Sequence, residues 1–243
     1  MKLETRNLKL ITLTLKASDT QKLTIAIDGP AGAGKSTIAA RLARKLGYVN
    51  LESGAMYRAL ALKAIRSDVS FDEEAALLAL AKSSQIRLEP TREGNRVFLD
   101  GVDVSQRIRE QDVTNAASRV SVHPAVRQWM VERQRELGAG GGVIMEGRDI
   151  GTQVFPHADV KVFLDAQPEV RQERRILQRV EKGAQPERQR IAAELQERDR
   201  RDRTRAASPL IPADDAVIID SSHMSIDQVV DKVEELVGEK LRN

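Results

Sequence analysis

A glycine-rich run that begins at Gly29 has the residue types and spacing of a phosphate-binding loop. Gly29-Pro30-Ala31-Gly32-Ala33-Gly34-Lys35-Ser36 fits the pattern G-x-x-x-x-G-K-[ST] and lies between an apolar stretch and an Ala- and Leu-rich one. Backbone N–H groups of such a loop converge on phosphate oxygens, and the following helix adds its positive end. We expect Lys35 to reach the β- and γ-phosphates of a nucleoside triphosphate and the Ser36 hydroxyl to bind Mg²⁺. The predicted triphosphate-binding segment runs from Gly29 to Thr37.

Arginines follow two further apolar stretches, and the carboxyl ends of parallel strands are where open sheets bind ligands. After the first of them, Ser53 either caps the next helix or contacts a ligand, and Arg58 either faces the strand ends or lies in solvent. After the second, Arg148 is a candidate phosphate clamp, because its guanidinium binds phosphate through two parallel hydrogen bonds. Asp149 either binds magnesium, accepts from a base amino group, or pairs with the neighbouring arginine.

A stripe of side chains late in the sequence changes from apolar to charged. It comprises positions at i, i+4, i+7, i+11 and i+14 of one expected helix, which are Ile191, Leu195, Arg198, Asp202 and Arg205. One face of this helix therefore leaves the core and enters charged surroundings, and two arginines around an aspartate suit a ligand with phosphate and hydroxyl groups. A solvated helix end is the alternative.

A second basic helix lies just upstream of that stripe. Its arginines are spaced so that three or four share one face, and they are Arg171, Arg174, Arg175 and Arg179. The break Gly183-Ala-Gln-Pro186 follows, which indicates a mobile lid that closes over phosphates and excludes water. Arg174 and Arg175 are the lid residues expected to stabilise the transferring phosphoryl group. A charged surface hairpin is the alternative for each arginine.

None of the three histidines, His123, His157 and His223, lies in a pattern that indicates a general base. Transfer of a phosphoryl group to an acceptor that is already anionic needs positioning and charge stabilisation rather than proton removal. A sequence rich in arginine and without an evident base therefore fits a phosphate acceptor.

The elements that must position these side chains follow from short apolar runs that alternate with helical patterns, which predicts a parallel sheet with helices on both faces. The five expected strands are Leu23–Asp28, Tyr48–Leu51, Val143–Glu146, Val160–Asp165 and Ala216–Asp220. The six expected helices are Ser36–Leu46, Met56–Ile65, Pro124–Leu137, Glu169–Val180, Ile191–Arg203 and Ile226–Leu241.

An antiparallel hairpin interrupts this alternation. Gln85–Glu89 and Arg96–Leu99 both alternate in polarity, and Arg92-Glu93-Gly94-Asn95 lies between them. We take residues 71–113 as an insertion beside the main sheet. The glycines between Gly138 and Gly142 form a joint or helix terminator before the third strand.

Composition limits the class of protein. The chain has 243 residues, of which 41% are hydrophobic, and no cysteine, so thiol and disulfide chemistry is excluded and a cytoplasmic protein is expected. We see no membrane-spanning run of about 18 apolar residues. Residues 1–21 have neither the apolar core nor the cleavage site of a secretory signal, and we assign them no role.

Four rival functions use the same loop: a GTPase, a motor or remodelling ATPase, an RNA-associated module and a kinase for another acceptor. A GTPase is disfavoured because the sequence lacks an N-K-x-D motif. Asp165 ends an apolar strand as a Walker B acid does, but a turn residue after a core strand is an equal interpretation. The arginine-rich segment 171–205 also suits an RNA-associated P-loop module, although 3% aromatic residues offer little base stacking. A kinase for another small acceptor, such as a shikimate-like one, stays open.

Together the motifs resemble those of bacterial cytidylate kinases from about Lys22 to Leu241. The resemblance is carried by Gly29–Thr37, Ser53-Gly-Ala-Met-Tyr57-Arg58, Asn115-Ala-Ala-Ser118, Gly147-Arg-Asp-Ile-Gly-Thr152 and Glu197-Arg-Asp-Arg-Arg-Asp-Arg-Thr-Arg205. It implies a P-loop fold with a five-stranded parallel core, a small antiparallel-sheet insertion and a short helical lid. The implied domain spans 22–243, with core segments 22–70, 114–170 and 206–243, a lid at about 171–190 and a substrate-contacting helix at 191–205.

The resemblance also implies an activity, which is transfer of phosphate from ATP, with Mg²⁺, to CMP and dCMP. Arg58 and Arg148 would hold the acceptor phosphate, whereas Ser118, Arg127 and Asp149 would bind the cytosine ring. The sugar and its surroundings would be contacted by Arg198, Asp202, Ser53, Tyr57 and Arg205. The implied protein is a monomer that needs no nucleic acid. The roles of Ser118 and Arg127 rest on the resemblance alone.

Overall fold

The structure is a computed structural model that describes residues 22–242 apart from 92–93, 182, 184 and 186. The expected extension at 1–21 lies outside the described residues. So do Arg92 and Glu93 of the expected hairpin turn and two positions, Ala184 and Pro186, of the expected break before the last basic helix.

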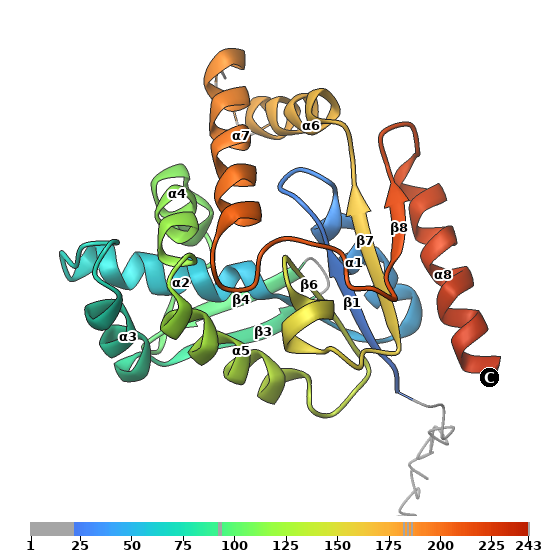
Figure 1. Ribbon diagram of the computed structural model, residues 1–243, viewed down its shortest axis with the longest axis horizontal. Helices are drawn as coiled ribbons and strands as arrows, with labels where there is room; N and C mark the ends of the chain where they lie inside the picture. Colours follow the sequence, from blue (N-terminus) through green and yellow to red (C-terminus); the bar gives the residue numbers. More distant parts are fainter. Residues whose placement is uncertain (1–21, 92–93, 182, 184, 186, 243) are drawn as a thin grey trace, which may run out of the picture.

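Five parallel strands form the central sheet, in the order β2-β6-β1-β7-β8 (Figure 1). They are β1 (Thr24–Asp28), β2 (Val49–Glu52), β6 (Val143–Gly147), β7 (Val160–Asp165) and β8 (Val217–Asp220). Successive side chains of the inner strands enter different cores: Ile25 and Ile27 lie on one face and Ala26 on the other. Burial on both faces explains their continuous apolar sequences, and the predicted α/β fold is confirmed.

Helices cover the two faces as separate layers (Figure 1). One core contains side chains of α1 (Lys35–Leu46) and α8 (Ile226–Arg242) packed on the sheet. The opposite core contains side chains of α2 (Ser53–Arg66), α4 (Gln111–Val120) and α5 (Pro124–Gly138). The α4 helix was not predicted. No helix in the described part of the chain is long and apolar enough to cross a membrane.

A three-stranded antiparallel sheet stands beside β2, where the hairpin was predicted. It consists of β3 (Ile86–Thr91), β4 (Gly94–Leu99) and β5 (Val102–Asp103), with Ile86 opposite Leu99. The helix α3 (Glu74–Ser83) precedes this sheet and the 3₁₀ turn η1 (Arg107–Arg109) follows it. Both were missed from sequence, and the exact limits 71–113 stay a prediction.

Two helices project above the carboxyl edge of the parallel sheet (Figure 1). α6 (Pro168–Val180) follows β7, and α7 (Arg188–Thr204) returns beside α4. A π-helical turn, η2 (Ile150–Val154), follows β6, because Asp28 at the end of β1 accepts hydrogen bonds from the N–H groups of Ile150 (2.8 Å) and Gly151 (2.7 Å). These segments surround the ends of β1 and β6.

Candidate active site

The glycine-rich loop joins β1 to α1 and is pressed against its neighbours. Gly29 has φ 145°, and a Cβ there would lie 1.9 Å from the carbonyl oxygen of Leu164 in β7. A Cβ on Gly32, at φ 81°, would lie 3.1 Å from the carbonyl oxygen of Arg171 in α6. Only glycine fits these positions, so the loop's backbone stays open toward the cleft, which Ala31 to Thr37 line.

Lys35 lies in the first turn of α1 and is buried. Its Nζ donates to the carbonyl oxygen of Pro30 at 2.7 Å. Burial first, and then the charge of Arg148, lower the pKa of Lys35 to about 7. Burial likewise raises the pKa of Asp28 to about 6, although the two backbone N–H groups it accepts oppose that shift. An anion in the loop would favour the charged form of Lys35.

Ser36 meets a buried carboxylate at the base of the cleft. Its Oγ donates to Glu146 Oε1 at 2.7 Å, so a hydroxyl and a carboxylate oxygen converge beside Lys35. Oxygen ligands of this kind suit Mg²⁺, which usually keeps several waters and takes further oxygens from phosphates. The described residues hold no group of three or more His, Cys, Asp or Glu placed for a metal ion, so the pair fits an ion that arrives with a nucleotide.

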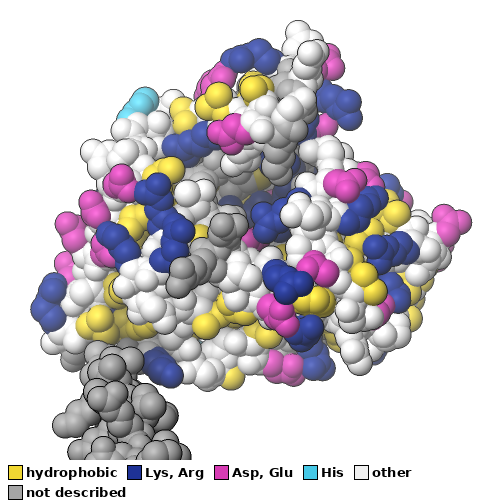
Figure 2. Space-filling model, turned by 180° about the vertical axis from the view of Figure 1, so that it is seen from behind, with side chains coloured by type: hydrophobic (Ala, Val, Ile, Leu, Met, Phe, Trp, Pro, Cys, Tyr) yellow, Lys and Arg dark blue, Asp and Glu magenta, His cyan; other side chains and the backbone are white. Residues whose placement is uncertain are grey.

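A single cleft of about 500 Å³ opens from the loop toward α2, α4 and α7. Figure 2 shows the molecule hollowed between its upper part and its body, with Lys and Arg side chains at the hollow. The cleft brings together the residues that were predicted to bind the acceptor and the two arginines that were expected to stabilise the transferring phosphoryl group. They are Ser53, Tyr57, Arg58, Ser118, Arg127, Arg148, Asp149, Arg174, Arg175, Arg198, Asp202 and Arg205.

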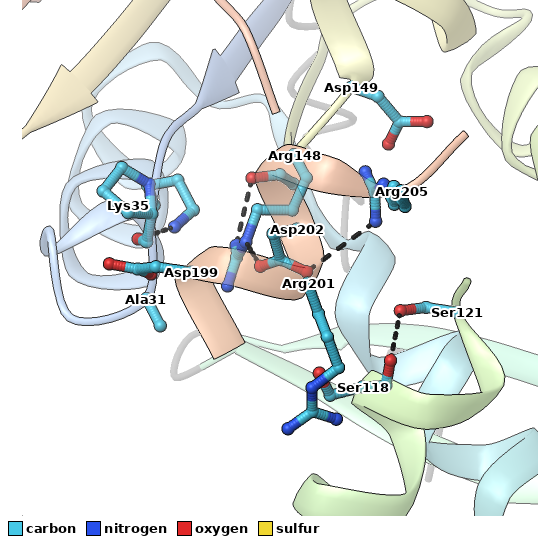
Figure 3. A network of polar contacts seen from close by, with 12 residues as sticks. Ala31, Lys35, Ser118, Ser121, Arg148, Asp149, Asp199, Arg201, Asp202 and Arg205 are labelled. Carbon is cyan, nitrogen blue, oxygen red and sulfur yellow. Dashed lines mark hydrogen bonds and ion pairs between the residues drawn. The ribbon is translucent and has the colours of Figure 1, made fainter. Parts of the chain in front are cut away.

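Arginines converge on Asp202 in the acceptor half of the cleft (Figure 3). Arg148 Nε donates to Asp202 Oδ2 at 2.8 Å, and Arg205 lies 3.8 Å from Oδ1. Burial opposes ionisation of Asp202, but the charges of Arg148, Arg198 and Arg205 outweigh it, so the pKa of Asp202 lies below its usual range. Burial and the nearby Arg148 lower the pKa of Arg198 to about 10. The cluster has three arginines around one aspartate, so its positive charge exceeds its negative charge.

Several buried polar atoms of the cleft have no hydrogen-bond partner among the described residues. They are Tyr57 OH, Ser118 Oγ, Arg58 Nε, Arg127 Nε, Arg198 Nε and one terminal nitrogen of Arg205. Buried polar groups in folded proteins are normally paired, because an unpaired group loses its hydration without compensation. Atoms of this kind gathered around one cleft indicate that a polar ligand completes their hydrogen bonds.

Asp149 forms its ion pair with Arg127 of α5, and both side chains are buried. The alternative of a pair between Asp149 and its neighbour Arg148 is wrong, because Arg148 turns to Asp202 instead. Burial is the largest influence on Arg127 and opposes its charge, but Tyr57 and Asp149 outweigh it and raise the pKa of the guanidinium.

Ser53 does not cap a helix, so that alternative is wrong. The cap position of α2 is Glu52, and Ser53 Oγ donates to the carbonyl oxygen of Glu146 at 2.8 Å, which joins α2 to β6. Arg58 is not a solvated surface residue either. Its side chain is 20% exposed and lies 3.3 Å from Glu52 Oε2, inside the cleft.

The lid arginines separate into two pairs. Arg174 donates to the carbonyl oxygens of Ala33 (3.3 Å) and Ser221 (2.7 Å), beside the glycine-rich loop. Arg175 also lines the cleft. Arg171 and Arg179 do not line it, because Arg171 pairs with Asp199 and Arg179 pairs with Glu194.

Two features were missed from sequence. Glu146 was seen only as the end of a strand, and its contact with Ser36 of α1 joins residues 110 positions apart in the sequence. Apolar side chains line the same cleft as the glycine-rich loop, namely Leu177 of α6 (59% exposed), Ile226 of α8 (43% exposed) and Met224 just before α8. The signal available in the sequence was apolar residues near the end of α6 and at the start of α8. Asp165 lies outside the cleft lining, as a strand-end residue would.

The parallel sheet, the glycine-rich loop and the arginine-lined second half of the cleft define the class of protein, a P-loop phosphotransferase. A family model described as cytidylate kinase matches residues 25–239, and the chain belongs to this family. The resemblance seen in the sequence motifs is thereby confirmed.

Relatives support the same assignment over nearly the whole length. The chain is 52% identical to a cytidylate kinase of Pelotomaculum thermopropionicum over 85% of this chain and 92% of the relative. It is 48% identical to a cytidylate kinase of Anoxybacillus flavithermus over 91% and 98%. A solved structure of an uncharacterized protein from Eubacterium ventriosum aligns with a TM-score of 0.50 at 9% identity, over 89% and 98% of the chains, which shows the fold alone.

Proposed function

We propose that the chain transfers the γ-phosphoryl group of ATP to CMP and dCMP, giving ADP and CDP or dCDP. The observation that carries this proposal is the cleft that Lys35 of the glycine-rich loop lines together with Arg148 and Arg198. Two phosphate-binding groups that face one space suit transfer between two phosphates. The name of the family supplies the nucleoside.

In the donor half, ATP lies with its phosphates on residues 29–37 and its base toward Leu177, Met224 and Ile226. Lys35 leaves the carbonyl oxygen of Pro30 and contacts the β- and γ-phosphates. Ser36 and Glu146 would hold Mg²⁺, which supplies positive charge to the phosphate oxygens.

In the acceptor half, Arg58 and Arg148 hold the phosphate of CMP through charge-assisted hydrogen bonds. The unpartnered Ser118 Oγ, together with Arg127 and Asp149, binds the cytosine ring. Arg198 and Asp202 bind the sugar, with Arg205, Ser53 and Tyr57 close by. All of these side chains line the same cleft as the glycine-rich loop, which supports the proposed roles.

Catalysis rests on alignment and charge. An oxygen of the CMP phosphate attacks the γ-phosphorus, and the bond to the ADP oxygen breaks. The attacking oxygen is already anionic, so no side chain has to remove a proton. Arg174 and Arg175 stabilise the group in transfer when residues 171–190 close as a lid, which also excludes water.

Three further assignments belong to this proposal. Residues 71–113 form the insertion that encloses the monophosphate, and the helix at 191–205 contacts the substrate. The enzyme acts as a monomer, and it acts in the cytoplasm, where nucleotide substrates are found.

Release of ADP, measured with a coupled assay over a panel of nucleoside monophosphates, tests the proposal. We expect CMP and dCMP to give the highest kcat/KM, UMP to follow and purine monophosphates to be poor. If no monophosphate increases ATP turnover but RNA does, the chain is an RNA-associated P-loop protein instead. A preference for a small acceptor without a nucleobase would assign a different kinase.

A further inference from the structure

Arg171 contacts the backbone of the glycine-rich loop at Ala31. It lies in the first turn of α6 and is 5% exposed. Its Nε donates to the carbonyl oxygen of Ala166 at 2.9 Å, and its NH1 donates to that of Ala31 at 3.1 Å. The backbone of Arg171 is also what a Cβ on Gly32 would strike. The position of the loop and the position of this side chain therefore depend on each other.

The same guanidinium reaches α7 through Asp199. Arg171 NH1 lies 2.6 Å from Asp199 Oδ2, and the two side chains are 6% and 15% exposed. Figure 3 shows Asp199 reaching from α7 toward Ala31, whereas Arg201 leaves the helix in a different direction. A continuous chain of polar contacts thus runs from the carbonyl oxygen of Ala31 to the middle of α7.

Asp199 stands next to the side chains that define the acceptor half. Arg198 precedes it, and Asp202, which holds Arg148, lies one turn further along α7. Neither Arg171 nor Asp199 lines the cleft. The pair therefore touches no substrate, and it can act on the reaction only by positioning the helix that does.

A buried ion pair contributes little net stability compared with apolar side chains of the same size, but it fixes relative geometry. Asp199 Oδ1 is buried without a hydrogen-bond partner in the described ranges. The carboxylate is thus held by Arg171 from one side, and a shift of the loop at Ala31 would reach α7 through that contact.

We propose that Arg171 and Asp199 are a positioning pair that couples occupancy of the glycine-rich loop to the placement of Arg198 and Asp202, so that ATP and CMP strengthen each other's binding. This inference rests on the proposed function. Coupling between two sites is reciprocal and usually amounts to about 5- to 150-fold in affinity.

The test compares binding of each nucleotide alone and together, by isothermal titration calorimetry on the full chain. The dissociation constant of CMP is measured with and without a saturating non-hydrolysable ATP analogue and Mg²⁺, and the reverse experiment follows. For the wild type, we expect each nucleotide to bind about fivefold or more tightly when the other is present, equally in both directions. Asp199→Asn should bring this gain close to one while each nucleotide alone binds within about threefold of wild type, as expected for lost coupling.

Two variants serve as controls. Glu197→Gln lies on the same helix and loses exposed ion pairs with Arg200 and Arg201, so its gain should match the wild type. Arg171→Lys keeps the charge but loses the NH1 group that contacts both Ala31 and Asp199. The increase in affinity in this variant should therefore lie between those of wild type and Asp199→Asn. Arg171→Lys also keeps the test valid if Asp199→Asn does not fold.

A gain in both Asp199→Asn and Arg171→Lys equal to that of the wild type would overturn the inference, even if their melting temperatures fell. The inference would also be overturned if, in the wild type, neither nucleotide changed the affinity for the other. ADP release by the wild type with CMP, measured on the same preparation, tells failure of the coupling apart from failure of the proposed function.

Discussion

The two halves of the cleft recognise phosphate in different ways. The phosphate-binding part of the proposed donor half is one contiguous segment, which lines the cleft from Ala31 to Thr37 and whose lysine already has a partner in Pro30. The acceptor half is built from side chains of α2, α4, α5 and α7 and of the loop after β6. Backbone donors serve any triphosphate, whereas assembled side chains can distinguish one acceptor from another.

The two halves also differ in how many of their buried polar atoms have hydrogen-bond partners among the described residues. Unpartnered buried atoms gather on the acceptor side, at Tyr57, Arg58, Ser118, Arg198 and Arg205. Burial beside other arginines holds the pKa of Arg198 at about 10. A site with this much uncompensated burial recognises its ligand strongly at a cost in stability of the free protein. Four measurements test this contrast, and the first should show the largest effect.

Removal of the donor lysine should abolish turnover without harming the fold. Lys35→Ala removes the cation that contacts the β- and γ-phosphates, and we expect kcat to fall about a thousandfold. The melting temperature should stay the same or rise, because Lys35 is buried with a lowered pKa. Lys45→Ala in the same helix, where Lys45 pairs with Glu234 at the surface, is the matched control. Normal activity of Lys35→Ala would refute the assignment of the donor half.

Removal of the acceptor clamp should affect activity and stability together, in contrast to Lys35. Arg148→Ala loses the phosphate contact and leaves Asp202 without its closest partner. We expect kcat/KM for CMP to fall about a hundredfold and the free energy of unfolding to fall by about 3 kcal/mol. The KM for ATP should change little. A variant that weakens ATP and CMP equally would show that Arg148 does not belong to the acceptor half.

Two serines of the acceptor half should respond in opposite ways. Ser118 Oγ has no partner within the described segments, so Ser118→Ala should lower kcat/KM for CMP about tenfold with no loss of stability. Ser121 Oγ donates to the carbonyl oxygen of Ser118 at 3.1 Å, so Ser121→Ala should cost about 1 kcal/mol of stability with a smaller effect on kcat/KM. Steady-state kinetics and thermal unfolding of both variants decide. Equal losses of stability would contradict a ligand-directed role of Ser118.

The smallest effect concerns the pH dependence of the donor half. Burial and Arg148, with Arg198, hold the pKa of Lys35 near 7 against the opposing charges of Glu146 and Asp28. ATP favours the charged lysine and raises its pKa, so binding takes up a proton above pH 7 and affinity falls as pH rises. From pH 7 to pH 8 we expect about fivefold weaker binding. Calorimetry in buffers of different ionisation enthalpy measures the proton uptake, which should be absent in Lys35→Arg.

The contrast also explains what sequence alone could predict. The donor loop and the five strands are contiguous, so their patterns were visible, and each strand bound lies within one residue of the structure. The acceptor residues were visible as arginines near strand ends, but the pairs Arg127–Asp149 and Arg148–Asp202 join positions 22 and 54 apart. Only tertiary structure selects such pairs from several that the sequence allows.

The helix α4 shows the same limit in secondary structure. Its sequence, Gln-Asp-Val-Thr-Asn-Ala-Ala-Ser-Arg-Val, contains β-branched and short polar residues of low helix propensity. Packing against α2 stabilises it, and contacts with distant elements override local preference. Ser118 lies on this helix, and the base-binding role that we propose for it came from the family resemblance alone.

The unpartnered atoms of the acceptor half also bear on how long the protein survives. Ligand that binds only the folded state raises its stability, by about 2.7 kcal/mol at a concentration one hundred times the dissociation constant. Because Tyr57, Ser118 and Arg198 have buried atoms without a partner among the described residues, we expect a bound nucleotide to stabilise the folded protein. A shift in melting temperature on adding each nucleotide would then rank its ligands, and a fall in nucleotide concentration would shorten the lifetime of the protein as well as slow its reaction.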